Sequence, residues 1–523
     1  MKTKNIAIAL LLAGLVGLNS CKDFLDEEPR STVTSGVYYQ NAAQAQENVN
    51  TLYRMGAPVR YASTGAYIGP TASINTMLTG YFTNSYEGQE LVTLYARQLT
   101  RQQNTRIVSN TMNTIWNEGY RAINVANGAI KYIPGIAMDE NLRNRLVAEA
   151  KFFRAFNYFY LVKTFGPLPL SSQPYETMDN IYLERSPVEE VYALIEADLR
   201  EAVDVLPATT FAANGHRITR FAAAMALANV YLQQGKFADA ATYAKIVVES
   251  PHNLTQNDDL GMNSAYNKLR STDDLAEVIY AYEYNATISN SGWWPANAFS
   301  SSATAVFGTY SIFERVYGPT DRFLNVYTPE DLRIQPNQFY HWEYTNPVNG
   351  RTWSSDVAGI WYFYDEDALL NTGRGTKDWN FYRYAEALLI AAEATARAGN
   401  AVTAEAAGYL GRVKARASTT GKTAEQFAAE LQGLSVDAFV EEVWTERLRE
   451  LPLEFKMWDD ILRTRKFPVI STTTKGAVTY VNLIGAQNGS GAVFKETDLV
   501  WPISLDELQR NPELDQNEGY QGR

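Results

Sequence analysis

Residues 218–250 read ITRFAAAMALANVYLQQGKFADAATYAKIVVES and decide the fold more than any other stretch. Small residues recur four apart on both sides of Gly235, at Ala224 and Ala228 before it and at Ala240 and Ala244 after it. Residues four apart lie on one face of a helix, and alanine on that face lets two helices approach closely. Glycine readily takes the left-handed conformation that ends a helix. The stretch therefore predicts two helices that turn back on each other at Gly235.

Further helix pairs are predicted on both sides of this stretch. Residues 380–400, NFYRYAEALLIAAEATARAGN, and 401–417, AVTAEAAGYLGRVKARA, form a similar pair around a Gly-Asn turn. Two long amphipathic helices are also predicted at about 104–133 and 141–164. The pairs resemble tetratricopeptide units, and about four of them are enough to stack into a short superhelix. A plain helical bundle is the alternative.

Between the helical parts, residues 57–100 and 280–380 are rich in Gly, Ser, Thr, Asn, Pro and aromatic residues. Short runs such as AEVIYAYEY (276–284), QFYHWEY (338–344) and GIWYFY (359–364) predict strands. We therefore expect a mainly α fold: a scaffold of tetratricopeptide-like helix pairs with large loop-rich insertions and a few short strands. Loops on a rigid scaffold are the usual place for recognition.

The first residues predict an export signal and a lipid anchor. Lys2 and Lys4 precede an apolar run that is too short to span a bilayer comfortably. The text Leu-Asn-Ser before Cys21 is similar to a bacterial lipobox, and Cys21 is the only cysteine, so it has no partner for an intrachain disulfide. We expect residues 1–20 to be a lipoprotein signal peptide, Cys21 to carry palmitate and related acyl chains, and residues 21–36 to form the lipidated tether. No later run of 18 apolar residues predicts a span.

The formal net charge is −12, which argues against nucleic acid as a partner, because nucleic-acid binding needs Lys and Arg to neutralise phosphates. The charge says nothing about the fold.

Six stretches, taken in order along the chain, resemble the SusD/RagB-like family of outer-membrane nutrient-binding lipoproteins. They are CKDFLDEEP (21–29), RAFNYFYLVKTFGPLPL (154–170), the repeat at 217–250, RYAEALLIAAEATARAGN (383–400), TERLRELPLEFKMWDDILR (445–463) and LVWPISLDELQRNPELDQNEGY (499–520). One departure from the family's usual text, at 451–456, includes Pro452, which predicts the end of a helix there.

The resemblance implies a protein anchored to the outer membrane and facing the cell exterior. It implies a glycan ligand, or in some members a peptide, and a TonB-dependent barrel transporter as the partner on which the protein acts as a lid. It also implies an N-terminal region at 37–265 with tetratricopeptide-like helix pairs and a C-terminal region at 266–523 with the ligand face and closing helices.

Catalysis has weak support in the sequence. The histidines are isolated, no cysteine set could hold zinc, and no phosphate loop or nucleophile elbow is found, so we expect no cofactor, no metal and no enzyme activity. Two acidic groups remain as glycosidase candidates. Glu441, Glu442 and Glu446 are more simply explained by ion pairing along a helix, whereas residues 365–367 either line a cleft or solvate a turn. A surface glycoside hydrolase therefore stays as an alternative.

Candidate ligand-binding residues come from loop chemistry, since sugars need aromatic faces for their C–H patches and polar side chains for their hydroxyls. We expect them in three loops, with burial in the core as the alternative for the aromatic ones: Tyr81, Asn84 and Glu87; Asn290, Trp293 and Trp294; and Arg351 with Trp353. Of the two adjacent tryptophans, we expect one to point inward and the other outward.

Overall fold

The computed structural model describes residues 39–56, 72–85, 91–176, 181–287, 294–297, 306 and 317–522. Helices dominate it, as predicted. They are α3 (Ala42–Leu52), α5 (Ala72–Met77), α6 (Leu91–Arg97), α7 (Thr105–Tyr132), α8 (Glu140–Phe165), α9 (Val188–Val205), α10 (Arg220–Gln233), α11 (Phe237–Val248), α12 (Ala265–Ser271), α13 (Trp294–Asn297), α15 (Asp321–Leu324), α16 (Tyr384–Gly399), α17 (Ala404–Ala417), α18 (Ala424–Leu431), α19 (Val436–Glu450), α20 (Met457–Thr464) and α21 (Leu505–Arg510).

The pair that the sequence predicts around Gly235 is α10 and α11. Gly235 has φ +70°, and the Lys236 N–H donates to the carbonyl of Tyr231 across the turn (2.9 Å), so the glycine supplies the left-handed residue that ends α10. The four alanines of the repeat are completely buried, which is the close helix contact that their size permits. The second predicted pair, α16 and α17, turns at Asn400, which is also left-handed.

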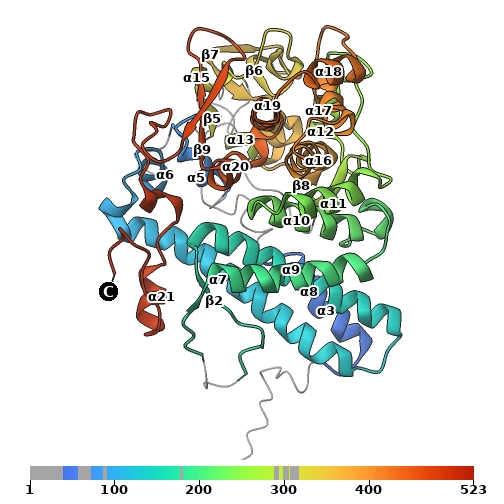
Figure 1. The fold of residues 1–523 in the computed structure, drawn as a ribbon, viewed down its shortest axis with the longest axis vertical. Coiled ribbons are helices and arrows are strands. Elements are labelled where there is room, and N and C mark those ends of the chain that lie inside the picture. The colour runs from blue at the N-terminus through green and yellow to red at the C-terminus, as the bar shows by residue number, and fades with distance from the viewer. Residues whose placement is uncertain are drawn as a thin grey trace, which may run out of the picture.

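The helices pack in chain order into a continuous stack. Helix α7 packs on α8, α8 on α9, α9 on α10 and α10 on α11, and α11 then packs on α16, which contacts α17 and α19. Figure 1 shows the stack rising from α7, α8 and α9 through α10 and α11 to α16. The contact between α11 and α16 crosses the division expected at residue 265, so the stacking continues over it.

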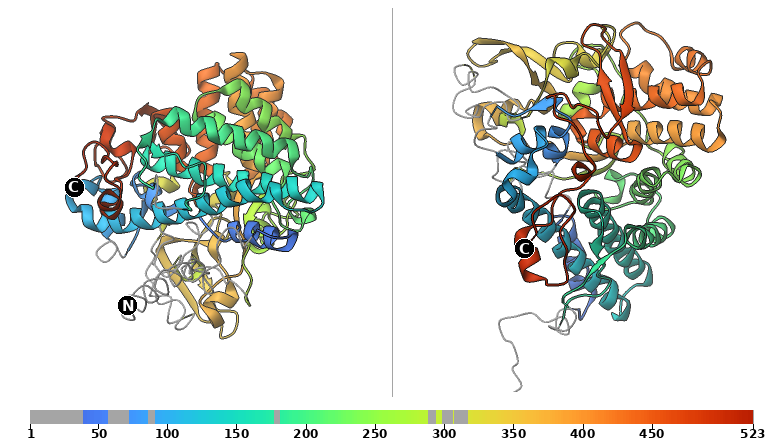
Figure 2. Two further views of the ribbon diagram at one scale, coloured as in Figure 1. Left: turned by 90° about the horizontal axis from the view of Figure 1, so that it is seen from below. Right: turned by 60° about the vertical axis from the view of Figure 1, so that its left-hand side comes forward.

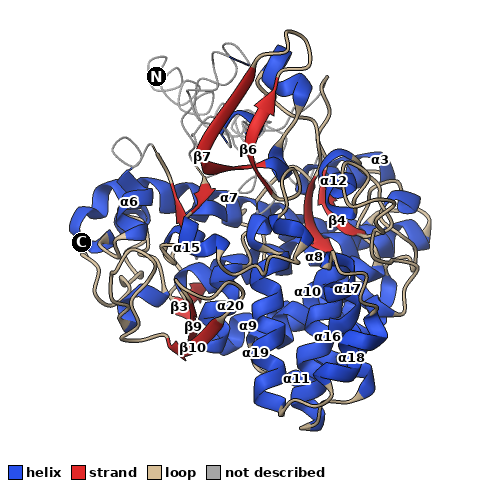
Figure 3. Cartoon of the chain, turned by 90° about the horizontal axis from the view of Figure 1, so that it is seen from above, coloured by secondary structure: helices blue, strands red, loops and turns tan. Residues whose placement is uncertain are grey.

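The strands form small antiparallel pairs beside the helices (Figure 3). The pairs are β1 (Phe82–Thr83) with β5 (Gly318–Pro319), β2 (Leu168–Pro169) with β3 (Arg185–Ser186), β4 (Val278–Tyr282) with β8 (Trp379–Arg383), β6 (Tyr340–Thr345) with β7 (Thr352–Ile360), and β9 (Lys466–Ile470) with β10 (Val478–Asn482). Two runs predicted as strands, 276–284 and 338–344, contain β4 and β6.

The third run, GIWYFY, is a strand only at its first two residues, and the strand prediction is wrong for the rest. Strand β7 ends at Ile360, and Trp361–Phe363 form a turn of 3-10 helix. The indole N–H of Trp361 donates to Asn267 Oδ1 (2.8 Å), and its ring stacks on Tyr364, three residues later (centroids 4.2 Å apart). Residues three apart overlie each other in a 3-10 turn and not in a strand, so the stacking requires the turn.

The C-terminal segment returns to the first long helices, where α21 packs against α7 (Figure 2). Arg101 is fully buried there, pairs with Asp498 (3.0 Å) and lies over the ring of Trp501 (4.6 Å to the centroid). Among the residues that the structure describes, no helix is long and apolar enough to cross a membrane.

A buried network of charges joins the helix stack to the strands. Arg383, at the end of β8, pairs with Glu277 just before β4 (2.6 Å) and with Glu450 on α19 (3.1 Å). Arg416 on α17 pairs with the same two glutamates. We call this set, with the further members below, the buried charge network.

Other members enter the network from the segment after α19 and from a short turn at 332–334. Helix α19 ends at Glu450, just before Pro452, as predicted. The segment that follows brings a second acid to Arg383, since Glu454 accepts a hydrogen bond from Arg383 Nε (2.7 Å). Arg333 reaches Glu446 (2.7 Å) and Glu450 (2.9 Å). Burial acts to raise the pKa of Glu446, but the charges of Arg333, Lys414 and Arg449 outweigh it and lower that pKa to about 2.

We expect Arg383→Met to reduce the free energy of unfolding by about 3–5 kcal/mol, because it leaves Glu277, Glu450 and Glu454 buried with less positive charge to answer them. Urea unfolding followed by circular dichroism measures the change. The matched control is Arg510→Met, which breaks an exposed pair with Glu507 on α21 (2.6 Å) and should cost less than about 1 kcal/mol. Equal losses in the two variants would contradict a stabilising role for the network.

Candidate functional site

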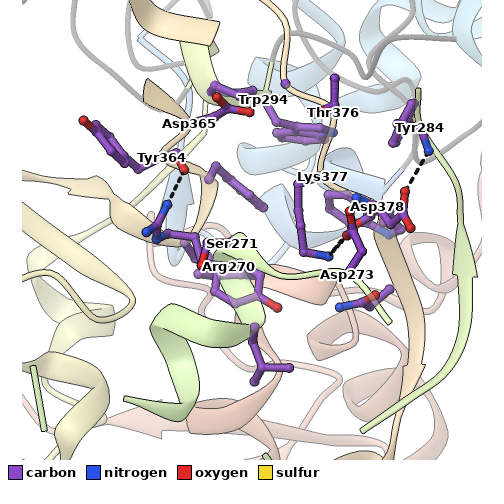
Figure 4. A pocket seen from close by; sticks show the side chains of 18 of the residues that line it. Arg270, Ser271, Asp273, Tyr284, Trp294, Tyr364, Asp365, Thr376, Lys377 and Asp378 are labelled. Atoms are coloured by element: carbon purple, nitrogen blue, oxygen red, sulfur yellow. Dashed lines mark hydrogen bonds and ion pairs between the residues drawn. The ribbon is translucent and has the colours of Figure 1, made fainter. Parts of the chain in front are cut away.

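A cavity of about 320 Å³ opens among the loop-rich segments beside β8, and Figure 4 shows it from close by. Its walls come from α12 and the residues after it, from α13, from the turn at 362–367, from residues 375–380 and from Leu453 and Glu454. With Tyr284, which also lines the cavity, six segments of the sequence thus meet here. The last of them is tied to the helix stack by the buried charge network, because Glu454 both lines the cavity and pairs with Arg383.

One wall of the cavity is aromatic. Trp294 is 4% exposed, and its ring lies 5.2 Å from Phe363 and 5.5 Å from Trp379 between centroids. Phe455 lies behind it (5.4 Å) and stacks almost parallel to Trp379. Such rings give a large apolar surface that is held rigidly by its neighbours.

The opposite edge carries a second aromatic pair. Tyr364 is half-buried and stacks face to face on Trp361, with 8° between the ring planes. Arg270 on α12 lies over both rings, and its Nη1 donates to the carbonyl of Tyr364 (2.8 Å). The guanidinium therefore holds the turn in place, and Tyr364 presents a fixed ring at the cavity edge.

The remaining edge is polar and centres on Asp378. Its Oδ1 accepts from the backbone N–H of Tyr284 (2.8 Å), and Lys377 beside it pairs with Asp273 (2.7 Å). Burial, together with the negative charges of Asp273 and Glu283, raises the pKa of Asp378 to about 7, against that hydrogen bond and the charge of Lys377, which act to lower it. Near neutral pH this carboxyl is therefore partly protonated and can both donate and accept hydrogen bonds.

The structure places Trp294 in the cavity wall, where it is buried; Trp293 lies outside the described residues, so the expected division between the two tryptophans stays a prediction. Arg351 is exposed in the turn between β6 and β7, and Trp353 on β7 is half-buried. Trp353 does not line the cavity, but its ring lies 5.3 Å from Tyr344, which in turn lies 6.1 Å from Tyr364. A continuous row of rings therefore leads from this hairpin to the cavity edge.

Tyr81 and Asn84 lie in the core instead of on the surface. Tyr81 is completely buried, and its hydroxyl donates to the carbonyl of Pro468 (2.6 Å), so it presents no face to a ligand. Asn84 is 3% exposed and lies within reach of the Thr93 hydroxyl (3.4 Å). Strand β1, which lies between these two residues, pairs with β5 and holds this part of the segment in the interior. Four other predicted residues lie outside the described part of the chain: Cys21, Glu87, Asn290 and Trp293.

The two acidic groups that the sequence singled out differ in position. Glu446 belongs to the buried charge network, so the ion pairing predicted along a helix face extends to neighbouring elements through the interior. Asp365, Glu366 and Asp367 line the cavity and also shape its turn, since Asp365 Oδ1 accepts from the N–H of Ala368 (3.0 Å). This second group therefore does both things that were predicted as alternatives: it lines a cavity and it shapes a turn.

Histidines take no part in lining the cavity. His341 is completely buried, and burial lowers its pKa well below the usual value. His216 lies 2.9 Å from Asp274 and 2.6 Å from Glu283. Within the described ranges, no group of three or more His, Cys, Asp and Glu side chains is arranged to hold a metal ion.

No site role was predicted for Tyr364, Arg270 or Asp378. The run WYFYDED does contain a usable signal, because it places aromatic residues directly beside three acids, and a sugar site needs both kinds of side chain. For Arg270 and Asp378 no local signal exists, since Arg270 reaches the cavity through the contact of α12 with the turn at Tyr364, and Asp378 through its hydrogen bond to Tyr284.

The stacked helix pairs and the loop-built aromatic cavity together define a tetratricopeptide-like binding scaffold. A family model described as "SusD family" matches residues 311–520, and one described as "Starch-binding associating with outer membrane" matches residues 23–232. The chain belongs to the SusD/RagB-like family.

Relatives of this family match nearly the full length. A SusD-like protein of Formosa agariphila is 28% identical over 89% of this chain and 91% of its own. The crystal structure of a SusD superfamily protein from Parabacteroides distasonis superposes with a TM-score of 0.77 at 26% identity, covering 94% of this chain and all of the other. Surface glycan-binding protein A from Bacteroides thetaiotaomicron, solved with laminarihexaose, has the same fold (TM-score 0.67, 16% identity, coverage 91% and 99%).

We expect Asp378→Asn to stabilise the protein above pH 7 by about 1–3 kcal/mol and to have little effect near pH 4. The folded-state pKa of about 7 lies above the usual value, so the folded protein holds this proton between pH 4 and pH 7 while the unfolded chain has lost it. Stability from this group therefore falls as pH rises through that window, and asparagine, which keeps the acceptor for Tyr284, removes the fall.

Thermal unfolding at pH 4, 6 and 8 measures the effect. The matched control is Asp204→Asn, an exposed acid at the end of α9, whose removal should change the melting temperature by similar small amounts at each pH. A pH-independent shift in Asp378→Asn would contradict the raised pKa.

Proposed function

We propose that the protein is a cell-surface lipoprotein that binds a polysaccharide or oligosaccharide and delivers it, unchanged, to a TonB-dependent outer-membrane transporter. The observation that carries the proposal is the aromatic and acidic cavity among the loops of a SusD-like scaffold. Family relatives that bind glycans, such as the one solved with laminarihexaose, support it.

The cavity has the two kinds of surface that a sugar needs. Tyr364 and the Trp294 wall offer ring faces for the C–H patches of a pyranose. Carboxylates at Asp365, Glu366 and Asp367 offer acceptors for its hydroxyls, and charged acceptors make stronger hydrogen bonds than neutral ones. A cavity of about 320 Å³ holds only a short part of a polysaccharide, so a polymer would thread across it with the rest of its length outside.

Anchoring and transport rest on the N-terminal sequence and on the family. Cys21 would carry the acyl chains, since several chains give a stable anchor and one alone does not. Residues 22–36 would act as the tether between the lipid anchor and the binding scaffold, so that the protein can act as a lid on the barrel. The family description that includes association with the outer membrane supports this location.

A peptide ligand is the second candidate, since the same aromatic and acidic surfaces also suit basic or aromatic side chains. A hydrolase is the third. The raised pKa of Asp378 in a cavity with other acidic side chains is what a general acid needs, so this alternative has one specific observation in its favour. A reducing-sugar assay decides it: steady release of product from the bound polysaccharide, lost in Asp378→Asn, would replace binding with catalysis.

We expect Tyr364→Ala to weaken glycan binding about 5–30-fold, because a half-exposed ring contributes about 1–2 kcal/mol of stacking and contact. Affinity electrophoresis in polysaccharide gels, followed by calorimetry with the best ligand, measures the change, and a protein digest in a parallel gel tests the peptide alternative. The control is Tyr182→Ala, an exposed tyrosine beside α7 that is 50% accessible and should leave binding unchanged. Unchanged binding in Tyr364→Ala with full folding would remove the cavity from the proposal.

We expect Cys21→Ser to abolish labelling by a clickable palmitate analogue and to move the protein from the membrane fraction to the medium or periplasm. Deletion of residues 22–30 should keep the lipid and ligand binding but reduce glycan uptake by cells, because a shortened tether restricts the lid. Normal uptake after the deletion would contradict the tether role, and a membrane-bound Cys21→Ser protein would contradict the anchor.

A further inference from the structure

The cavity has an unequal balance of charges. Among the described residues that line it, six are acidic and two are basic. The acids are Asp273, Asp365, Glu366, Asp367, Asp378 and Glu454. Glu454 is already paired with Arg383 in the buried charge network, so its negative charge is balanced by an arginine behind the cavity wall.

Both cations of the cavity are committed to the protein itself. Lys377 Nζ lies 2.7 Å from Asp273 Oδ1 and 3.2 Å from the carbonyl of Asp378. Arg270 lies over two rings and donates to Tyr364 and Asn267, and burial lowers its pKa. An anionic ligand would compete with Asp273 for Lys377, and it would find Arg270 already bonded through Nε and Nη1 to Asn267 and Tyr364.

The carboxylates at the turn, unlike the two cations, still have acceptor capacity for a ligand. Asp365 and Asp367 each accept one intramolecular hydrogen bond, from the Ala368 N–H (3.0 Å) and from Asn371 Nδ2 (2.8 Å), which leaves further lone pairs for a ligand. Glu366 between them is exposed. Hydroxyl groups of a neutral sugar can donate to these oxygens, whereas a carboxylate or sulfate at the same distance is repelled.

We propose that this cavity takes an uncharged sugar unit and rejects sugars that carry a carboxylate or a sulfate. The inference rests on the proposed glycan-binding function and gives it a substrate class: neutral polysaccharides, with uronates and sulfated polymers excluded. The negative charges of Asp273 and Glu283 add to the effect of burial in raising the pKa of Asp378, and the same charges would act against an anionic sugar at this edge.

The first experiment is affinity electrophoresis of the soluble form that starts at Asp23. Gels contain neutral polymers (laminarin, starch, galactomannan) or anionic ones (alginate, polygalacturonate, carrageenan, chondroitin sulfate). Retardation only by a neutral polymer supports the inference. Retardation by an anionic polymer that is lost in Tyr364→Ala overturns it and leaves the glycan-binding function standing. No retardation in any gel counts against the proposed function and removes the inference with it.

The second experiment compares the bound neutral polymer with the same polymer oxidised at C6 to the uronate, by calorimetry at pH 7.5. We expect the oxidised form to bind at least about tenfold more weakly, since each added carboxylate meets like charges at close range. The variant Asp365→Asn/Glu366→Gln/Asp367→Asn should reduce this ratio at least about threefold, because the amides keep acceptors but carry no charge.

The ratio of the two affinities is the readout, so a loss common to both forms does not affect it. Asp204→Asn removes a remote charge and should leave the ratio at its original value. A ratio near one in the unmodified protein, or a ratio that the triple variant leaves unchanged, would overturn the inference.

Discussion

The structure depends on the buried charge network more than on any other interaction. Arg383 and Arg416 share Glu277 and Glu450 in an interior where all four side chains are at most 2% exposed. Taking such charges out of water is costly, and the cost is recovered only when every partner is in place. The network therefore favours one arrangement of β4, β8, α17 and α19, and every misplaced element leaves an unanswered buried charge.

This constraint explains why a cavity made from loops can hold its shape. Arg383 lies at the end of β8, four residues after Trp379 in the aromatic wall, and Glu454 lies next to Phe455 behind that wall. The helix stack is thus connected to the cavity at two places: Arg383 holds the strand that carries Trp379, and Glu454 holds the segment that carries Phe455. Packing of the rings then fixes the wall, since Trp294, Trp379 and Phe455 lie within 5.5 Å of one another between centroids.

The scaffold was largely predictable from the sequence, and the site was not. Helix spacing, the small faces of α10 and α11 and the Gly235 turn are local features, so they can be read one segment at a time. Burial of Tyr81 and the placement of Asp378 depend on strand pairs that join residues far apart in the chain, such as β1 with β5 and β4 with β8. The composition of their segments predicted both Tyr81 and Trp294 as aromatic residues in loops. It could not distinguish Tyr81, which packs in the core, from Trp294, which lines the cavity.

The separation of scaffold from site also suits a family whose members share the fold at low identity. Here α10, α11 and α16 carry the packing, the network fixes the base of the cavity, and the turn at 362–367 supplies the exposed ring and the carboxylates. A change in that turn alters the charge and shape that a ligand meets without touching the helices, because Tyr364 and the acids after it lie at the edge. In this turn the ring of Tyr364 would supply binding strength, and the carboxylates after it would discriminate against charged sugars. Because these are different residues, one property can change while the other is kept.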